Sequence, residues 1–345
     1  MSPVSLENTS APAVDTRDRP LRDLRISVTD RCNFRCTYCM PAEIFGEKYA
    51  FLPRKELLTF EEIELLVRVF VSLGVAKLRI SGGEPLLRAD LASLIAQVSQ
   101  IDGLLDTALT TNATLLPRQA EGLRKAGLGR LTVSLDSLDE AVFRQMNGDK
   151  LSVAQVLDGI KAAEGAGFRR LKINCVVQKG VNDHTILGLA RHFRHTGHIL
   201  RFIEYMDVGT RNDWDLTHVV TYDEILETIG SEYPLRPLDP NHVGEVAKRF
   251  EYEDGSGELG LVTSVSRPFC GDCSRARLTT DGKLVTCLFA GSGVDLRGPL
   301  RDGASEDELR EIVRGVWDMR SDRYSEERGK ATTKRARMEM YQLGG

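Results

Sequence analysis

The chain has 345 residues, of which 41% are hydrophobic, enough to bury the core of one large α/β barrel or of two domains. Its formal net charge of −4 gives no general attraction to nucleic acid or to an anionic membrane, and we expect neither partner. Any anionic substrate therefore requires a local cluster of positive side chains.

The seven cysteines set a second constraint. No apolar run approaches the length of a membrane span, and residues 1–20 show no secretory signal, so we expect them to form a disordered tail. A cytoplasmic location follows. In that reducing compartment grouped cysteines bind metal or do redox work rather than form disulfides.

An alternation of strands and helices begins near residue 21. The expected strands span residues 23–29, 77–81, 107–112, 131–136, 171–177 and 199–206. Helices are expected at 59–73, near 89–100, up to 127, up to 167, at 183–195 and near 221–229. The first has the clearest ends, because Thr59 and Glu62 form a capping box and Gly74 stops it. Six mostly apolar strands predict a parallel sheet covered by helices, as a partial barrel or a doubly wound sheet.

Polar or glycine residues follow nearly every expected strand at its carboxyl end. That end is the catalytic face of barrel enzymes, so the pattern favours the barrel. After residue 232 the rhythm changes: 249–289 indicate short antiparallel strands, and 306–319 an amphipathic helix. We therefore expect a core at 21–232 and a smaller α+β segment at 233–345.

Cys32, Cys36 and Cys39 follow the first expected strand in the pattern C-x3-C-x2-C. Three thiolates suit zinc, copper(I) or an iron–sulfur cluster. Zinc would need a fourth ligand, and no histidine occurs before His184. A 4Fe–4S cluster held by three cysteines would leave one iron open to another group.

This loop, with Tyr38 before its last cysteine, resembles the radical S-adenosylmethionine (SAM) superfamily. The stretch SGGEP at 81–85 resembles the glycine-rich element of that superfamily. The resemblance implies a partial (β/α)6 TIM-type barrel whose first 4Fe–4S cluster binds SAM and generates a 5′-deoxyadenosyl radical. It assigns four residues to the SAM site: Tyr38, Gly83, Ser134 and Met206. Without the resemblance, strand-end capping explains Ser134 equally well, and core packing explains Met206.

A second trio, Cys270, Cys273 and Cys287, lies in the C-terminal segment. A zinc ribbon would need a fourth ligand, yet neither cysteine nor histidine follows Cys287, so a second open 4Fe–4S cluster is favoured, with a distant ligand as the alternative. Arg275 and Arg277 share one face if they lie on a strand. Together they suit a phosphate group, and an exposed ladder paired with carboxylates is the alternative.

From about residue 20 to its end, the chain resembles the GTP 3′,8-cyclase family of molybdenum cofactor biosynthesis. The resemblance rests on RPLRDLRISVTDRCNFRCTYCMP, LRISGGEPLLR, LTVSLDSLD, RFIEYMDVG, FCGDCSRARL and the terminal Gly-Gly. Departures are small: Ala113 stands where a glycine often follows Thr-Thr-Asn, and Ser81 replaces a common threonine. In this family the second cluster binds the substrate GTP, which lies between the two clusters.

The resemblance implies abstraction of the C3′ hydrogen of GTP and closure of C3′ onto guanine C8, giving 3′,8-cyclo-7,8-dihydro-GTP. No catalytic side chain beyond the cofactors is implied. The positions that match GTP contacts are Arg25, Arg79, Thr110, Lys172, Arg275 and Arg277. Lys77 adds positive charge nearby. Gly344 and Gly345 are expected to reach into the active site, and a frayed tail is the alternative.

The implied partners are an external electron donor and cyclic pyranopterin monophosphate synthase, the next enzyme of the pathway. The sequence leaves the oligomeric state open, a homodimer included. Two other functions stay open. One is a radical SAM enzyme that modifies peptides with an auxiliary cluster, although such enzymes usually carry more C-terminal cysteines. The other is a cytosolic zinc-binding interaction module.

Several conspicuous residues are not assigned to the site. Cys175 lies in an apolar strand and is expected to be buried. Asp136 and Glu84 are expected to cap backbone or to contact SAM. Three histidines spaced three residues apart are expected on a solvated helix: His192, His195 and His198.

Overall fold

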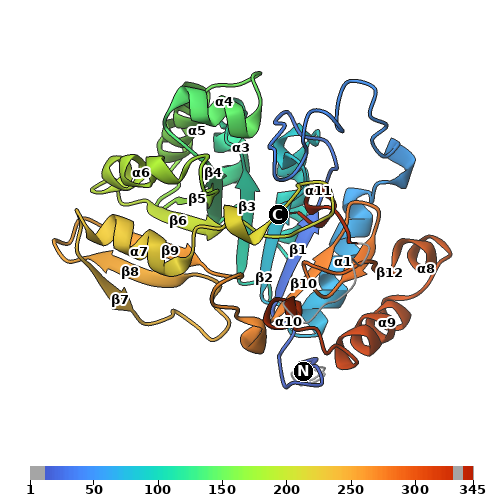
Figure 1. The fold of residues 1–345 in the computed structure, drawn as a ribbon. Coiled ribbons are helices and arrows are strands. Elements are labelled where there is room, and N and C mark those ends of the chain that lie inside the picture. Colours follow the sequence, from blue (N-terminus) through green and yellow to red (C-terminus); the bar gives the residue numbers. More distant parts are fainter. Residues whose placement is uncertain (1–11, 329–336, 345) are drawn as a thin grey trace, which may run out of the picture.

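The computed structural model describes residues 12–328 and 337–344. Its strands form one twelve-stranded sheet in the order β12-β11-β10-β1-β2-β3-β4-β5-β6-β9-β8-β7 (Figure 1). The six central strands are parallel: β1 (Asp23–Ser27), β2 (Lys77–Ser81), β3 (Asp106–Thr111), β4 (Arg130–Ser134), β5 (Lys172–Val177) and β6 (Ile199–Glu204). The predicted α/β partial barrel is confirmed.

Helices pack on the outer side of these strands (Figure 1). They are α1 (Phe60–Ser72), α2 (Leu91–Val98), α3 (Leu116–Lys125), α4 (Glu140–Asn147), α5 (Val153–Gly165), α6 (Ile186–Phe193) and α7 (Tyr222–Gly230). The predicted capping box of α1 is present, because the side chains of Thr59 and Glu62 each accept a backbone hydrogen bond from the other residue. The helical region before Gly167 consists of two helices, since Gly148 ends α4 with a φ of 88° and Ser152 caps α5.

The C-terminal segment extends the sheet at both of its edges. Its strands are β7 (Leu235–Leu238), β8 (Lys248–Tyr252), β9 (Glu258–Val262), β10 (Arg275–Leu278), β11 (Lys283–Val285) and β12 (Val294–Asp295). The expected antiparallel pairing occurs between β8 and β9 and between β10 and β11. Unexpectedly, β9 pairs in parallel with β6, and β10 pairs in parallel with β1. Because Arg275 is aligned with Asp23, Cys273 lies at the amino end of the parallel strands, opposite the first cysteine loop that follows the carboxyl end of β1.

Four helices complete the C-terminal segment: α8 (Arg297–Arg301), α9 (Glu306–Asp318), α10 (Tyr324–Glu327) and α11 (Met340–Leu343). Helix α9 packs on α1, and the short α11 contacts β1, so the described C-terminal end lies near the centre of the molecule (Figure 1). The chain thus returns to the barrel after leaving it.

Residues 12–20 correct the expectation of a disordered tail. Ala13 is fully buried, and its backbone N–H donates to the carbonyl of Leu73 at 2.9 Å. Val14 and Pro20 form an isolated bridge, so this segment folds back on itself. Its ordering follows from polar contacts with distant residues, which no local pattern reveals. Residues 1–11 lie outside the described part of the chain.

Four of the unassigned residues are buried, and two of them, Glu84 and Asp136, belong to the cavity wall described below. Cys175 is 1% exposed inside β5, as predicted. His198 is 6% exposed and lies 3.2 Å from a carboxylate oxygen of Glu164, so the prediction of a solvated histidine is wrong there. His198 precedes β6 directly and lies beside the ring of Phe193, with 6.4 Å between the ring centroids.

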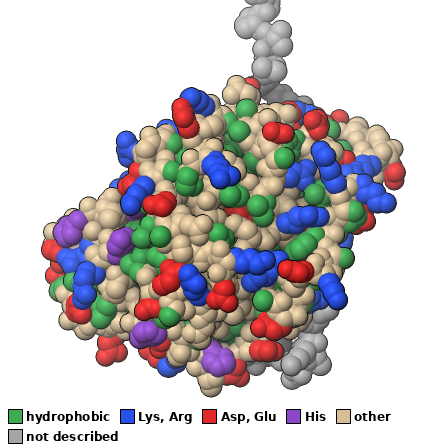
Figure 2. All heavy atoms as spheres, turned by 90° about the horizontal axis from the view of Figure 1, so that it is seen from above, with side chains coloured by type: hydrophobic (Ala, Val, Ile, Leu, Met, Phe, Trp, Pro, Cys, Tyr) green, Lys and Arg blue, Asp and Glu red, His purple; other side chains and the backbone are tan. Residues whose placement is uncertain are grey.

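Positive and negative side chains are interspersed on the face shown in Figure 2. Within residues 12–328 and 337–344, no helix has both the length and the apolar composition of a membrane span. Several arginine and lysine side chains gather inside the molecule, in the cavity described next.

Candidate active site

A cavity of about 580 Å³ lies inside the curved sheet and is lined by residues from all six parallel strands and from the C-terminal segment. Members of both cysteine trios contribute to its wall: Cys32, Cys39, Cys270, Cys273 and Cys287. The two motifs are more than 200 residues apart in the chain (270 minus 39), yet they face one space. The cavity can therefore hold one ligand against both trios.

The first cysteine loop is held by its own arginine. Arg35 donates from Nη1 to the carbonyls of Cys32 at 2.8 Å and Phe34 at 2.7 Å, and from Nε to the carbonyl of Phe45 at 2.7 Å. The N–H of Cys39 donates to the carbonyl of Cys36 at 3.0 Å. These bonds fix the backbone, so the three sulfurs do not depend on a ligand for their placement.

The glycine pair after β2 packs directly on that loop. A Cβ on Gly83 would lie 2.3 Å from the carbonyl oxygen of Arg31, so only glycine fits. The N–H of Gly83 already donates to the carbonyl of Thr29 at 2.7 Å. Any contact of this glycine with a ligand amino group therefore falls to its own carbonyl oxygen.

Glu84 and Asp136 are buried carboxylates that brace the cavity wall. Glu84 accepts from the N–H groups of Leu86 and Asn112 and from the hydroxyl of Thr111, and burial raises its pKa to about 7. Asp136 accepts from the hydroxyl of Tyr38 at 2.8 Å, and burial raises its pKa to about 6. Both carboxylates are used by protein groups, which fits capping rather than acid–base chemistry.

Three of the predicted SAM-site side chains line the same cavity as Cys32 and Cys39. Tyr38 is anchored to the barrel through Asp136, while Ser134 at the end of β4 and Met206 after β6 both line the cavity. Gly83 also lines this cavity.

The two trios suit clusters better than single ions. In the described part of the chain, no three His, Cys, Asp or Glu side chains converge closely enough to share one metal ion. A 4Fe–4S cluster takes each of its thiolates on a different iron, so its cysteines do not share one ion. All six sulfurs are free cysteines in partly buried positions. Soft thiolate donors in two groups of three therefore fit two three-cysteine clusters.

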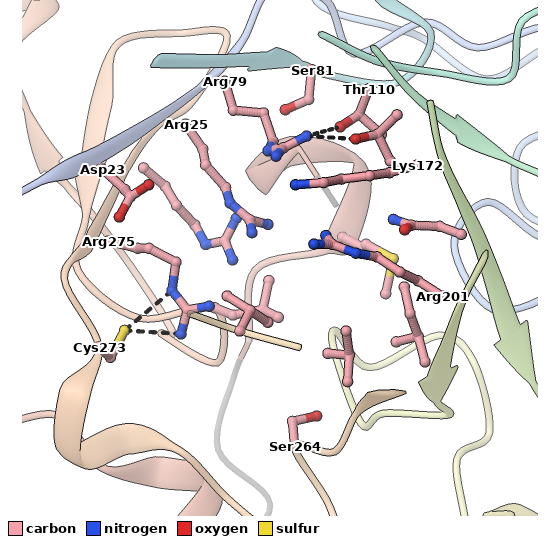
Figure 3. A pocket seen from close by; sticks show the side chains of 18 of the residues that line it. Asp23, Arg25, Arg79, Ser81, Thr110, Lys172, Arg201, Ser264, Cys273 and Arg275 are labelled. Carbon is pink, nitrogen blue, oxygen red and sulfur yellow. Dashed lines mark hydrogen bonds between the residues drawn. The ribbon is translucent and has the colours of Figure 1, made fainter. Parts of the chain in front are cut away.

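Arg275 contacts the second trio directly. Its Nη2 and Nε lie 3.1 and 3.4 Å from the sulfur of Cys273 (Figure 3). Burial alone would raise the pKa of Cys273, but Arg275 and Arg320 lower that pKa to about 6. This sulfur is therefore poised as a thiolate, the form that binds iron.

Three arginines form a row across neighbouring parallel strands. Arg277 on β10 is aligned with Arg25 on β1, and Arg25 is aligned with Arg79 on β2. Like charges placed side by side in a sheet repel one another, and burial of each costs several kcal/mol. Burial and the neighbouring guanidiniums lower the pKa of Arg25 to about 9. An anion beside such a row would relieve this repulsion.

Lys172 on β5 and Arg201 on β6 extend the positive charge across the cavity (Figure 3). Burial, Arg201 and other nearby cations lower the pKa of Lys172 to about 6. Arg79 donates to the hydroxyl of Thr110 at 3.1 Å. This hydrogen bond orients the guanidinium of Arg79.

Carboxylates do not neutralise this group. Among the described residues, none of the following pairs with an Asp or Glu within 4 Å: Arg25, Arg79, Lys172, Arg201, Arg275 and Arg277. Lys77 is different, because its Nζ lies 3.4 Å from Asp23. The exposed ladder of ion pairs considered for Arg275 and Arg277 is therefore wrong, and the group is suited to a polyanionic ligand.

The C-terminal tail enters the same space. Nη1 of Arg277 lies 3.3 Å from the carbonyl oxygen of Gly344, and Gly344 has a φ of 64°. A Cβ there would lie 2.1 Å from Oγ of Ser81, so the position requires glycine. Gly345 lies outside the described residues.

Sequence reasoning missed Arg201, Arg130 and two residues far from the motifs, Asp15 and Asp207. A basic residue within an otherwise apolar strand marks Arg201, just as it marks Arg79, and could have identified it. Asp15 and Asp207 carry no such signal in the sequence. Asp15 binds Arg320 and Asp207 binds Arg328, and each of these arginines is more than 100 residues away.

Comparison with known families gives two adjoining matches. Residues 26–193 match the Radical SAM superfamily, and residues 198–326 match the Molybdenum Cofactor Synthesis C family. Together they span the barrel and the segment that carries the second trio.

Individual proteins also match this chain over most of its length. The chain is 55% identical to a GTP 3′,8-cyclase of Xanthomonas axonopodis pv. citri over 97% of this chain and all of that protein. It is 48% identical to a GTP 3′,8-cyclase of Staphylococcus haemolyticus over 96% of this chain and 98% of that protein. Among solved structures, Streptococcus suis SuiB bound to its precursor peptide SuiA aligns with a TM-score of 0.60 at 16% identity, covering 94% of this chain and 77% of that one. This last likeness concerns the fold alone.

Proposed function

The chain belongs to the GTP 3′,8-cyclase family of radical SAM enzymes, and from this membership we propose that its cavity holds GTP between the two cysteine trios. The reaction moves the C3′ hydrogen of GTP to 5′-deoxyadenosine and joins C3′ to guanine C8. One electron and one proton complete 3′,8-cyclo-7,8-dihydro-GTP, an intermediate of molybdenum cofactor biosynthesis. When bound, the first 4Fe–4S cluster and SAM supply the radical that abstracts the hydrogen.

The observation that carries the substrate assignment is the unneutralised row of Arg277, Arg25 and Arg79. A triphosphate supplies the several negative charges that this row and Lys172 lack, and guanidiniums bind phosphate oxygens in pairs. Thr110 keeps Arg79 in place through its hydroxyl. We assign the triphosphate to this group of residues.

The remaining assignments follow from position in the cavity. Cys32, Cys36 and Cys39 would hold the first cluster, with Gly83, Tyr38, Ser134 and Met206 around its SAM. Cys270, Cys273 and Cys287 would hold the second. Arg275 would hold the thiolate of Cys273 and face the substrate. The core at 21–232 would thus supply the SAM site, and the segment at 233–345 would supply the second cluster and close the cavity over GTP.

The partners are proposed on chemical grounds. An external donor would supply the electrons that reduce the first cluster. The product would pass to cyclic pyranopterin monophosphate synthase, and a homodimer is one oligomeric state to test. None of the seven cysteines, all of which the structure describes, is joined in a disulfide, which supports a reducing cytoplasm as the place of action. Nothing in the cavity favours a peptide substrate over a triphosphate.

Anaerobic incubation tests the proposal. The reconstituted, reduced protein is mixed with SAM and either GTP or ATP, and 5′-deoxyadenosine is quantified. We expect formation that depends on GTP, with ATP giving only background. Equal amounts with and without GTP would overturn the substrate assignment.

A further inference from the structure

In the described N-terminal segment, Asp15 and Arg19 form a buried charge cluster with Arg320, beside the second cysteine trio. Oδ2 of Asp15 lies 2.6 Å from Nε of Arg19 and 2.9 Å from Nη1 of Arg320. The three side chains are 0%, 2% and 1% exposed. Oδ1 of Asp15 accepts the backbone N–H groups of Arg17 and Arg19 at 2.9 and 3.0 Å. Both carboxylate oxygens are therefore occupied, and the segment is fixed in shape.

The two arginines of this cluster hold both ends of the short turn Cys270–Asp272. Nη1 of Arg19 donates to the carbonyl of Cys270 at 2.8 Å. Nη1 of Arg320 donates to the carbonyl of Cys273 at 2.8 Å. The turn has little support of its own, since its internal bond from the N–H of Cys273 to the carbonyl of Cys270 is 3.3 Å long. Two cysteines are thus positioned from outside their own loop.

The cluster is also tied to the helix before it. The indole N–H of Trp317 donates to the carbonyl of Arg19 at 3.1 Å, and the guanidinium of Arg320 lies 4.5 Å from the Trp317 ring. Within the described residues, Nη2 of Arg19 is buried without a hydrogen-bond partner. Arg19 and Arg320 both line the cavity, so the charge cluster is part of its wall.

We propose that Asp15, Arg19 and Arg320 form a positioning clamp that holds Cys270 and Cys273 in the geometry the second cluster needs. The inference rests on the second cluster of the proposed function. Removing the negative charge of Asp15 leaves two guanidiniums buried side by side, so they separate and release the carbonyls of both cysteines. The N-terminal segment is thereby part of the cluster site, 251 residues away along the chain.

The test isolates the second cluster. In a protein carrying Cys32→Ala, Cys36→Ala and Cys39→Ala, bound iron and the electron paramagnetic resonance signal of the reduced protein report the second cluster alone. Adding Asp15→Asn is expected to speed loss of iron to a chelator by at least about tenfold, the effect of losing an outer-shell partner. Arg17→Gln, on the exposed side of the same segment, is the matched control and should leave the rate unchanged.

A second pair of measurements separates positioning from general stability. Arg19→Lys keeps a positive charge beside Asp15, but its single ammonium group cannot also donate to the carbonyl of Cys270. This variant should therefore also speed the loss of iron from the second cluster and alter its electron paramagnetic resonance signal. In the otherwise unsubstituted protein, Asp15→Asn should leave the first cluster in place. Unchanged chelation in both variants, or equal loss of both clusters, would overturn the clamp. A triple-alanine protein that binds no iron at all would refute the second cluster itself, and the clamp with it.

Discussion

The carboxylate of Asp207 accepts a hydrogen bond from Nε of Arg328 at 2.9 Å, across 121 residues of chain. Its other oxygen accepts from Nη1 of Arg337 at 2.8 Å and from the hydroxyl of Tyr324. Asp207 directly follows Met206, a predicted SAM-site residue. One carboxylate therefore ties the loop after β6 to the segment that carries the C-terminal tail.

Asp207→Asn should weaken both the fold and SAM binding. The side chain of Asp207 is 7% exposed, and its loss leaves two guanidiniums uncompensated, which costs about 3–5 kcal/mol of unfolding free energy. Because the Met206 loop is released, we expect the KM for SAM to rise more than kcat falls. Denaturant unfolding and SAM-dependent formation of 5′-deoxyadenosine measure the two effects. Asp213→Asn, exposed on the same loop, is the control, and an equal response of both variants would contradict the prediction.

GTP binding should be accompanied by proton uptake. Without ligand, burial and neighbouring cations hold the pKa of Lys172 at about 6, so at pH 7 it is mostly neutral. A triphosphate adds negative charge, raises this pKa above 7, and so draws up to about one proton onto Nζ. Calorimetry in buffers of different ionisation enthalpy measures that proton.

The matched variants for this experiment are Lys172→Met and Lys125→Met. Lys125 is 74% exposed on α3, and its replacement should leave proton uptake as it is. Lys172→Met should abolish the uptake and weaken binding. Uptake that survives Lys172→Met would assign the proton to another group.

The local features of this fold follow from sequence because they depend on neighbours in the chain. The capping box of Thr59 and Glu62 involves residues three apart, and it forms as predicted. The glycine pair at Gly82 and Gly83 is likewise recognisable, since it sits where one backbone must pass close to another. Both cysteine trios also stand out by spacing alone.

The long-range features could not be predicted from residues alone. Arg25 and Arg277 lie in one row only because β10 pairs in parallel with β1, and neither strand encodes that partner in its own pattern. Asp15 lies in a polar stretch that lacks the hydrophobic periodicity of a helix or a strand, and such a stretch predicts disorder. Its burial depends on Arg320, which lies 305 residues away. Contacts of this kind are fixed by tertiary packing, which overrides local composition.

Removing one cysteine from the first trio should halve the iron content. We expect about eight irons per chain in the reconstituted protein and about four after Cys36→Ala, because a cluster with two thiolates is not retained. Iron and acid-labile sulfide analysis measures both values. Cys175→Ala is the control, since Cys175 is buried in β5 away from the cavity wall. About one zinc per chain in place of iron would contradict the cluster assignment.

Gly344→Ala should displace the tail from the active site. The added Cβ would lie 2.1 Å from Oγ of Ser81 and would occupy a backbone with a φ of 64°, so the contact with Arg277 is lost. We expect kcat to fall by at least about tenfold, equivalent to about 1.4 kcal/mol, because the guanidinium of Arg277 loses its contact with the tail beside the substrate. Steady-state formation of 5′-deoxyadenosine with GTP measures this.

The control for the tail is Gly315→Ala on α9. A Cβ at Gly315 meets nothing within 4 Å, and alanine favours a helix, so activity should be unchanged and stability slightly higher. Both variants should keep their full iron content, since neither glycine contacts a cysteine. If Gly344→Ala turned over GTP at the rate of Gly315→Ala, the tail would have no part in the reaction, and Arg277 would act on the triphosphate alone.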